Sequence, residues 1–279
     1  MSIVIRPIET LSGCADIQRV HREIWGNSAD EIIPTHVLIT WATNECVLLG
    51  AYDTDRVDEA HGMVGFALGW YGIYGEPARL KYCSHIVGVL PAYQGRDIGL
   101  KLKRAQRETL IRHGQTDIMT WTYDPLQIVN GSFNIHRLGG TSTTYKRDVY
   151  GEMTDQLNAG APSDRLQVDW MLQSTRVETH LAGNYPLWQA NEITIPVHVS
   201  DNMPHADQMP TWDGRPVGIP LPEQLALLRT HDVRRLQAWR QMQRRYFEAA
   251  FAAGYQVVDC VSIPDKGWNY ILVPAHERR

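Results

Sequence analysis

Residues 87–102, with the sequence VGVLPAYQGRDIGLKL, have the residue types and spacing that most clearly indicate chemistry. A β-branched run stops at a proline, a short loop with Gly95 follows, and a helical pattern begins at Ile98 with Gly99 beside it. Glycines let a ligand approach the backbone, and the unpaired N–H groups at a helix start create positive potential. Arg96 can add a charge-assisted contact. The sequence therefore predicts a cradle for an anion such as a pyrophosphate. Because no Lys-Ser or Lys-Thr follows the second glycine, this is not the nucleotide P-loop.

The same residues resemble the acyl-coenzyme A loop of the GNAT superfamily of N-acyltransferases, whose pattern is Gln/Arg-x-x-Gly-x-Gly/Ala. Gln94 and Gly99 match two of its three anchor positions, and Asp97 stands at the middle glycine. Asp tolerates the left-handed conformation and caps helices well, so we expect its carboxylate to turn back onto the helix N–H groups. The resemblance implies acetyl-coenzyme A, or another acyl-coenzyme A, as cosubstrate. The predicted cofactor-binding residues in and before the loop are Val87, Val89, Gln94, Gly95, Arg96, Asp97, Ile98 and Gly99.

The order of predicted elements around the loop extends the resemblance. Helices before and after a central mixed α/β sheet resemble the GNAT fold over roughly residues 1–150, with Leu138-Gly139-Gly140 where the family usually shows Leu-Gly-Phe. Periodicity and turn residues predict, in chain order, helices at 16–25 and 33–41, strands at 46–52, 63–70 and 79–90, a helix at 98–113, a strand at 117–123, a helix from after Pro125 to Arg137, and an extended segment at 141–150.

Residues 151–279 are predicted to form a C-terminal α+β extension. The exit from helix to strand at 246–255 is similar to the one that closes a GNAT domain, so a partial second GNAT-like unit is one interpretation. An extension that shapes the acceptor pocket or a homodimer surface is the other. The whole layout resembles an uncharacterised two-part bacterial branch of the superfamily. The sequence predicts polar loops at 151–165 and 201–222, strands at 166–172, 192–199, 255–261 and 268–273, and a helix at 232–253.

Composition limits the classes of partner and the compartment. The chain has 279 residues and a formal net charge of −4, which disfavours bulk attraction to nucleic acid. No apolar run approaches the length that crosses a bilayer, and residues 1–7 lack the core of a signal peptide, so no membrane partner is expected. Four scattered cysteines and the absence of metal-ligand spacing predict reduced thiols, no metal and a cytoplasmic location.

The resemblance implies that one face of the strand before the loop looks towards the acyl group and its acceptor. Simple alternation puts His85 on that face with Cys83 and Val87. His85 is the first candidate for the general base because imidazole titrates near neutral pH, the alternative being a packed or surface side chain. Glu23 and Glu31 lie near the first helices, which usually border the acceptor site in the family. The alternative for both is a solvated helix end.

Family resemblance also raises the question of the general acid. The family often uses a tyrosine in the helix before Leu-Gly-Phe, and Ile135 stands at the matching position here. The role then moves to Tyr123, Tyr145 or solvent. Asn130 and Asn134 are predicted to share one face of that helix and to bind the pantetheine arm, although an exposed polar face explains them equally well.

The resulting prediction is an acyltransferase. It would move an acetyl or other acyl group from acyl-coenzyme A to a primary amine of a small molecule or amino acid. The enzyme alternative is a different donor such as succinyl-coenzyme A. The alternative from another class is a non-catalytic protein that binds acyl-coenzyme A, favoured by Asp97 and by the missing tyrosine.

Overall fold

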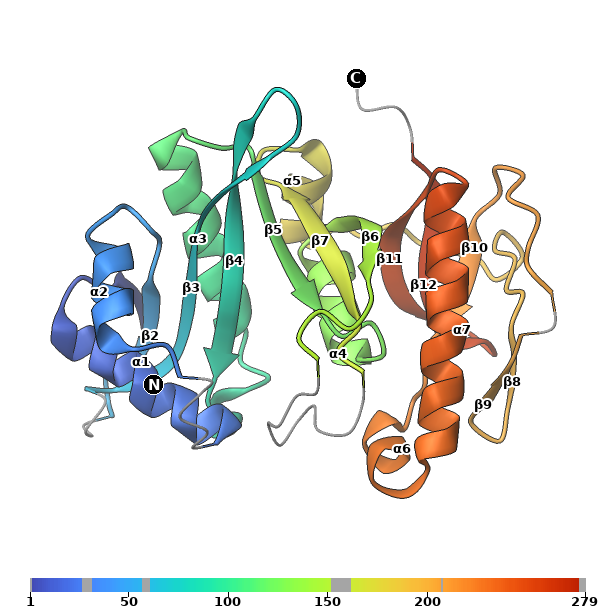
Figure 1. The fold of residues 1–279 in the computed structure, drawn as a ribbon, viewed down its shortest axis with the longest axis horizontal. Helices are drawn as coiled ribbons and strands as arrows, with labels where there is room; N and C mark the ends of the chain where they lie inside the picture. Colours follow the sequence, from blue (N-terminus) through green and yellow to red (C-terminus); the bar gives the residue numbers. More distant parts are fainter. Residues whose placement is uncertain (1, 27–31, 57–60, 152–161, 207, 276–279) are drawn as a thin grey trace. The chain divides into compact units, whose positions relative to one another are not determined.

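The structure is a computed structural model that describes residues 2–26, 32–56, 61–151, 162–206 and 208–275. These residues form two compact units, and the division falls inside one strand, between Trp121 and Thr122. Helices and strands are mixed in each unit, which confirms the predicted mixed α/β class (Figure 1). The domain boundary that the sequence places after residue 150 stays a prediction.

The first unit is built on a mixed sheet with strands in the order β1-β2-β3-β4-β5 (Figure 1). Neighbouring strands are antiparallel except for the parallel pair β4 and β5. Nearly continuous apolar runs make the central strands β2 and β3, and β3 is buried over its first half. The strands are β1 (Ile3–Pro7), β2 (Leu49–Asp53), β3 (Met63–Tyr74), β4 (Arg79–Val89) and β5 (Ile118–Tyr123).

Three helices flank this sheet: α1 (Leu11–Trp25), α2 (Thr35–Ala42) and α3 (Ile98–His113). Helix α1 begins at Thr10, whose side chain accepts a hydrogen bond from the N–H of Gly13, and it buries one apolar stripe. Helix α3 has the predicted bounds. Its end follows from Gly114, which adopts a left-handed conformation with φ of +66°.

A β-bulge in β4 changes which side chains share a face. Leu68 pairs with Ile86 and Gly69 pairs with Ser84, so His85 is an extra residue opposite two consecutive residues of β3. The extra residue shifts the inside-outside alternation of the strand by one position beyond it.

The bulge corrects one sequence prediction. Paired residues of antiparallel strands point to the same face, and Cys83 pairs with Trp70 while Val87 pairs with Ala67, three positions away on β3. Cys83 and Val87 therefore lie on opposite faces, and the ring of His85 packs against Trp70, on the face of Cys83. The predicted shared face of Cys83, His85 and Val87 was wrong, because simple alternation assumed a regular strand.

The second unit has its own antiparallel strands in the order β7-β6-β11-β12-β10, with a separate pair β8-β9 (Figure 1). Its strands are β6 (Thr141–Lys146), β7 (Arg165–Met171), β8 (His198–Ser200), β9 (Met203–His205), β10 (Val217–Pro220), β11 (Tyr255–Ile263) and β12 (Gly267–Pro274). Its helices are α4 (Ile128–Gly131), the π-helical turn η3 (Ser132–Arg137), α5 (Thr175–Leu181), α6 (Leu225–His231) and α7 (Val233–Ala252).

Helix α7 supplies much of this unit's core. Leu236, Trp239, Met242 and Tyr246 are buried at the spacing predicted from the sequence. The predicted strand at 192–199 was largely wrong, since only β8 and an isolated bridge at Thr194 form there. The predicted loop at 201–222 instead contains β9 and β10. The short strand β10 ends at a proline on the edge of its sheet, where proline does little harm.

Across the described ranges, no helix combines the length and the apolar character needed to cross a bilayer.

Candidate active site

The loop between β4 and α3 has the predicted form of strand, turn and helix start. A 3-10 turn, η2 (Pro91–Tyr93), follows the strand, and Gly95 then takes φ of +74°, a conformation that glycine adopts without strain. The Gln94 side chain closes the loop, because its Nε2 donates to the carbonyl oxygen of Val89 at 3.1 Å. Gln94 thus shapes the backbone of the loop.

Backbone donors gather at the start of α3. The first bond of the helix runs from the N–H of Lys101 to the carbonyl of Asp97, at 2.9 Å. Within the described ranges, no hydrogen bond joins the N–H of Ile98, Gly99 or Leu100 to another residue. These donors lie at the positive end of a helix of 16 residues. The loop therefore has the chemistry of an anion site.

Asp97 differs from its prediction in one respect. It stands at the N-cap in the left-handed conformation, with φ of 58° and ψ of 17°, as its place at the family's glycine implies. Its side chain, however, makes no capping bond to the helix N–H groups. Capping side chains usually belong to residues with extended backbone, and a left-handed residue directs its side chain elsewhere. The predicted capping of α3 by the Asp97 side chain was therefore wrong, and this residue is exposed in the loop.

Arg96 adds a positive charge to this loop. Its guanidinium carbon lies 5.2 Å from the ring centroid of Tyr93, within range of a cation–π contact. The Tyr93 hydroxyl in turn donates to the carboxylate of Asp53, which is buried, at 3.0 Å. The ring that supports Arg96 is therefore held in place by the sheet.

The strand before the loop has an open edge within the first unit. Strand β4 pairs with β5 only at Tyr82, opposite Met119, and at Cys83, opposite Thr120. Beyond Cys83, the described part of this unit places no strand against that edge up to Val89. An unpaired strand edge offers N–H and C=O groups to an extended ligand.

His85 lies at the bulge, next to this open edge. Its ring centroid is 4.9 Å from that of Trp70, which is in turn 4.9 Å from that of Trp41 on α2. The His85 residue is exposed, but neighbouring groups still remove part of its hydration and lower its pKa, which favours the neutral imidazole near pH 7. A neutral imidazole at this position can accept a proton.

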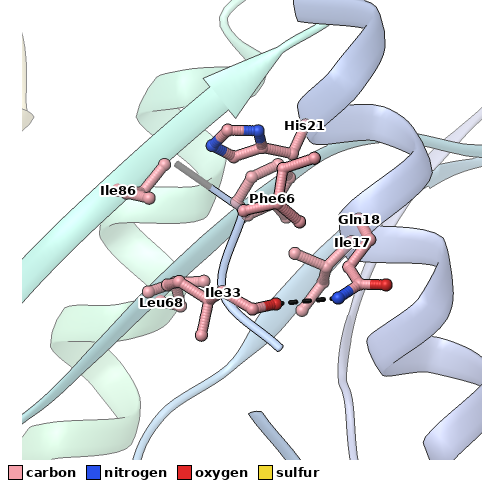
Figure 2. A pocket seen from close by; sticks show the side chains of 8 residues that line it. Ile17, Gln18, His21, Ile33, Phe66, Leu68 and Ile86 are labelled. Atoms are coloured by element: carbon pink, nitrogen blue, oxygen red, sulfur yellow. Dashed lines mark hydrogen bonds between the residues drawn. The ribbon is translucent and has the colours of Figure 1, made fainter. Parts of the chain in front are cut away.

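A small pocket lies between α1 and the sheet, on the face that carries Ile86 (Figure 2). Its cavity volume is about 10 Å³, which is room for about one water molecule. Figure 2 shows His21 reaching from α1 across Phe66 towards Ile86. Eight residues line the pocket: Ile17, Gln18, His21, Ile32, Ile33, Phe66, Leu68 and Ile86.

The structure separates Glu23 from this pocket. Glu23 follows His21 by two residues, about 200° around the helix, and its side chain is exposed with a carboxylate oxygen 4.0 Å from Arg56. Its role as base stays a prediction, and the exposed position also fits the alternative of a solvated helix end. Glu31, the other predicted carboxylate, lies outside the described residues.

The remaining predicted residues belong to the second unit. Tyr123 is buried, and burial raises its pKa well above the ordinary range, so it stays protonated. Asn130 is half-buried and donates to Gln127 at 3.3 Å, while Asn134 is buried in the π-helical turn. An exposed polar face is therefore wrong for Asn134. The wider turn of a π-helix also breaks the four-residue spacing that was taken to align it with Asn130.

Sequence reasoning missed two features of the first unit. His21 was passed over, although its place on the stripe of Cys14 and Ile17 is a signal that the helix directs it inward. Lys103 on α3 is also buried. Its Nζ donates to Ser84 Oγ at 2.8 Å and lies 3.5 Å from the ring centroid of Trp121, and burial holds its pKa well below the usual range. No sequence pattern marks a lysine as buried.

No protein-family model matches this chain, and no curated protein matches its sequence. Solved structures do match part of it. The ribosomal-protein-S18-alanine N-acetyltransferase from Escherichia coli is 12% identical with a TM-score of 0.47, over 62% of this chain and 96% of that one. NAA60 from Arabidopsis thaliana, solved with acetyl-CoA, is 16% identical with a TM-score of 0.47, over 62% of this chain and 100% of that one.

An acetyltransferase of the GNAT family from Streptococcus pneumoniae is 10% identical with a TM-score of 0.47, over 60% of this chain and 98% of that one. Similarity at this level concerns the fold alone. The reaction has to be inferred from the residues of this chain.

Proposed function

We propose that this chain is a GNAT-type N-acyltransferase that moves an acetyl group from acetyl-coenzyme A to a primary amine of a small molecule or amino acid. One observation supports this proposal above the others. The N–H groups of Ile98, Gly99 and Leu100 make no hydrogen bond within the described ranges, and they follow a glycine-bearing turn at the end of a bulged strand. Such donors suit a pyrophosphate.

The residues of the first unit fit the rest of coenzyme A as well. Arg96 can pair with a phosphate through a charge-assisted hydrogen bond. The open edge of β4 from Ser84 to Val89 can hydrogen-bond the amide groups of the pantetheine arm, as an added strand would. Asp97 opposes this fit, because its exposed carboxylate repels phosphate.

Acyl-coenzyme A, when bound, supplies a thioester carbonyl and a thiolate leaving group. N–H groups on the open edge of β4 polarise that carbonyl. An alkylammonium has an ordinary pKa near 10.4, so the acceptor must lose a proton before attack. We assign that proton to neutral His85. The new C–N bond then forms as the C–S bond breaks. The attacking nitrogen gives its second proton to the departing thiolate or to solvent, so the thiolate needs no strong acid to leave.

The proposal extends to a cytoplasmic location. The four cysteines of the chain all carry free thiols in the structure, and Cys14 and Cys260 are buried. Reduced thiols are typical of proteins in a reducing compartment.

A screen for released free thiol tests this function. The wild-type protein is incubated with acetyl-coenzyme A or succinyl-coenzyme A and with single amines, and thiol is measured against a reaction without amine. We expect release that depends on the amine and is faster with acetyl-coenzyme A. Faster release with succinyl-coenzyme A would identify that thioester as the donor in place of acetyl-coenzyme A. Coenzyme A binding without release for any amine would support the non-catalytic alternative.

A further inference from the structure

Lys103 on α3 is a buried lysine that the proposed reaction does not use. Only 2% of the residue is exposed, and within the described ranges no carboxylate pairs with its amine. Burial lowers its pKa well below the usual range, because an amine shielded from water loses its proton more easily. Burying such a group costs free energy, so the contacts that it makes need an explanation.

The contacts of Lys103 join two neighbouring strands. Its Nζ donates to Ser84 Oγ on β4 at 2.8 Å, and it lies 3.5 Å from the ring centroid of Trp121 on β5. Ser84 is buried as well, and its hydroxyl donates to Oε1 of Gln106, one turn further along α3, at 3.1 Å. Helix α3 therefore holds the Ser84 side chain through two of its own side chains.

Ser84 and Trp121 lie where the two strands separate, a point that we call the fork. The last parallel pair joins Cys83 to Thr120, so the next pair in this register would be Ser84 and Trp121. That pair does not form, and the open edge of β4 begins at Ser84. Residues in register on neighbouring strands point to the same face, which is why one group on α3 can contact both. Lys103 thus contacts both strands at the fork.

The fork determines two features that the proposed reaction needs from β4. The open edge supplies the N–H groups that we assign to the thioester carbonyl, and the bulge at His85 comes directly after Ser84. A slip of one residue at a bulge would turn the following side chains to the other face of the sheet. A contact that fixes Ser84 therefore also fixes where the edge opens and where His85 stands.

We propose that Lys103 is a positioning residue, which holds the fork between β4 and β5 through Ser84 and Trp121 and thereby places His85 and the N–H groups of the open edge for acyl transfer. This inference rests on the proposed function. In this role Lys103 acts through Ser84 and not on the substrates themselves.

A kinetic test compares Lys103→Met with the wild type. Methionine keeps an unbranched chain against Trp121 but loses the bond to Ser84. We expect kcat for thiol release to fall between about tenfold and about a hundredfold, because small misplacements at a reaction centre have effects of this size. The Kd for coenzyme A, measured by calorimetry, should stay within about twofold, because the donors for its pyrophosphate lie at the start of α3.

Lys266→Met, in the exposed turn between β11 and β12, is the matched control and should leave both quantities unchanged. Unchanged kcat in a folded Lys103→Met protein would overturn the inference. A loss of coenzyme A affinity as large as the loss of kcat would also overturn it, because Lys103 would then act in binding.

Variants of Ser84 test the contact through which Lys103 acts. Ser84→Ala removes the hydroxyl and should lower kcat as much as Lys103→Met does. Ser84→Thr keeps a hydroxyl on a residue that suits a strand and should restore most of the turnover. The double variant Ser84→Ala with Lys103→Met should be no slower than either single variant, because both changes break the same contact. Losses of kcat that multiply in the double variant would contradict a shared role.

Amide hydrogen exchange examines the fork without any catalysis. In Lys103→Met, amides of residues 82–87 should exchange at least about tenfold faster than in the wild type, while those of β2 should not change. Faster exchange in a protein whose wild type releases no thiol would retain the fork contact and reject the acyltransferase. Thiol release by the wild type, with unchanged exchange in Lys103→Met, would retain the enzyme and reject the positioning role.

Discussion

His85 combines three properties that a general base needs. It is next to the open edge of β4, its ring is packed against Trp70, and its pKa is lowered by the side chains around it. The bulge is what allows this, because the extra residue turns outward from the regular pairing. A base in this position acts only in its neutral form.

His85→Gln should therefore lower turnover by about a hundredfold or more while the affinity for coenzyme A is kept. In the wild type, turnover should fall as the pH drops below 6.5, because the lowered pKa of His85 places its protonation there. This acidic limb should flatten in the variant. Steady-state rates of thiol release from pH 5 to 9 measure both effects. Near-native turnover with the same pH dependence would make His85 purely structural.

The second prediction at the scale of residues concerns the contact of Arg96 with coenzyme A. Arg96→Ala should weaken binding of coenzyme A by about 1.5–3 kcal/mol, the usual value for a hydrogen bond to a charged group. Arg112→Ala removes the same charge near the far end of α3 and should leave the affinity unchanged. Calorimetry with both variants measures the difference. Equal losses of affinity in the two variants would show that the effect comes from the net charge of the protein and not from a contact of Arg96.

Sequence reasoning located these residues unevenly. Gln94, Gly95 and Gly99 were recognisable because their types and spacing follow from backbone geometry, which a local sequence can encode. His21 was not, because the pocket around its imidazole depends on Phe66 and Ile86 from other elements. The sequence also did not show on which face of β4 Val87 lies, because no local pattern marks a β-bulge.

At the scale of elements, the start of α3 is the part whose chemistry is most sensitive. Asp97→Gly removes an exposed carboxylate that makes no capping bond. We expect binding of coenzyme A to be equal or tighter, and the free energy of unfolding to change by less than about 1 kcal/mol, because glycine adopts the left-handed conformation freely.

Asp232→Gly is the matched control for this change. Asp232 caps α7 and accepts a hydrogen bond from the N–H of Arg235 at 3.0 Å. Its loss should cost a few tenths of a kcal/mol and leave binding of coenzyme A unaltered. Denaturation and calorimetry on both variants provide the comparison. A large loss of binding in Asp97→Gly would instead make that carboxylate part of the ligand site.

Helices and strands with strong local sequence signals were predicted better than those without. Helix α3 and strand β4 were placed within a residue of their observed bounds, because apolar periodicity, a proline and Gly114 mark their ends. Helix α5 and strand β10 were missed. Each is short, and β10 depends on pairing with β12 from distant sequence.

At the scale of the molecule, the second unit contains a buried ion pair that decides much of its stability. Asp124 accepts hydrogen bonds from Arg240 and from Arg229, each at 2.8 Å. Burial alone would raise the pKa of Asp124, but the two guanidinium groups outweigh it and hold that pKa below its usual value. The folded unit therefore depends on a charged Asp124.

Asp124→Asn should lower the free energy of unfolding at pH 7 by about 3–5 kcal/mol, because it leaves two arginines with a weakened partner in the interior. In the wild type, this contribution is fully present above the ordinary carboxyl pKa, near 3.9, and is lost as the pH falls through the lower folded value. Denaturant titrations at pH 7 and below pH 4 measure it. The exposed pair of Asp213 and Arg215 is the control, and Asp213→Asn should have little effect. Equal losses in the two variants would contradict the account.

This pair also shows what a sequence cannot reveal about the whole molecule. Asp124 and Arg240 are separated by 116 positions, and the arginines of α7 give that helix a basic side of the kind that is usually solvated. Their burial follows from how the second unit folds around them. The mixed α/β class, by contrast, follows from local patterns and was predicted.

The central claim is that the loop between β4 and α3 binds coenzyme A, and calorimetric titration of the protein with coenzyme A tests it most directly. The wild type and Gly99→Val are compared, with Ala105→Val, two turns further along α3, as the control for added bulk in that helix. We predict clear binding to the wild type and to Ala105→Val, and loss of at least about tenfold in affinity for Gly99→Val, since its side chain blocks the approach of phosphate to the backbone. Unchanged affinity in a folded Gly99→Val protein, or no binding by the wild type, would contradict the account.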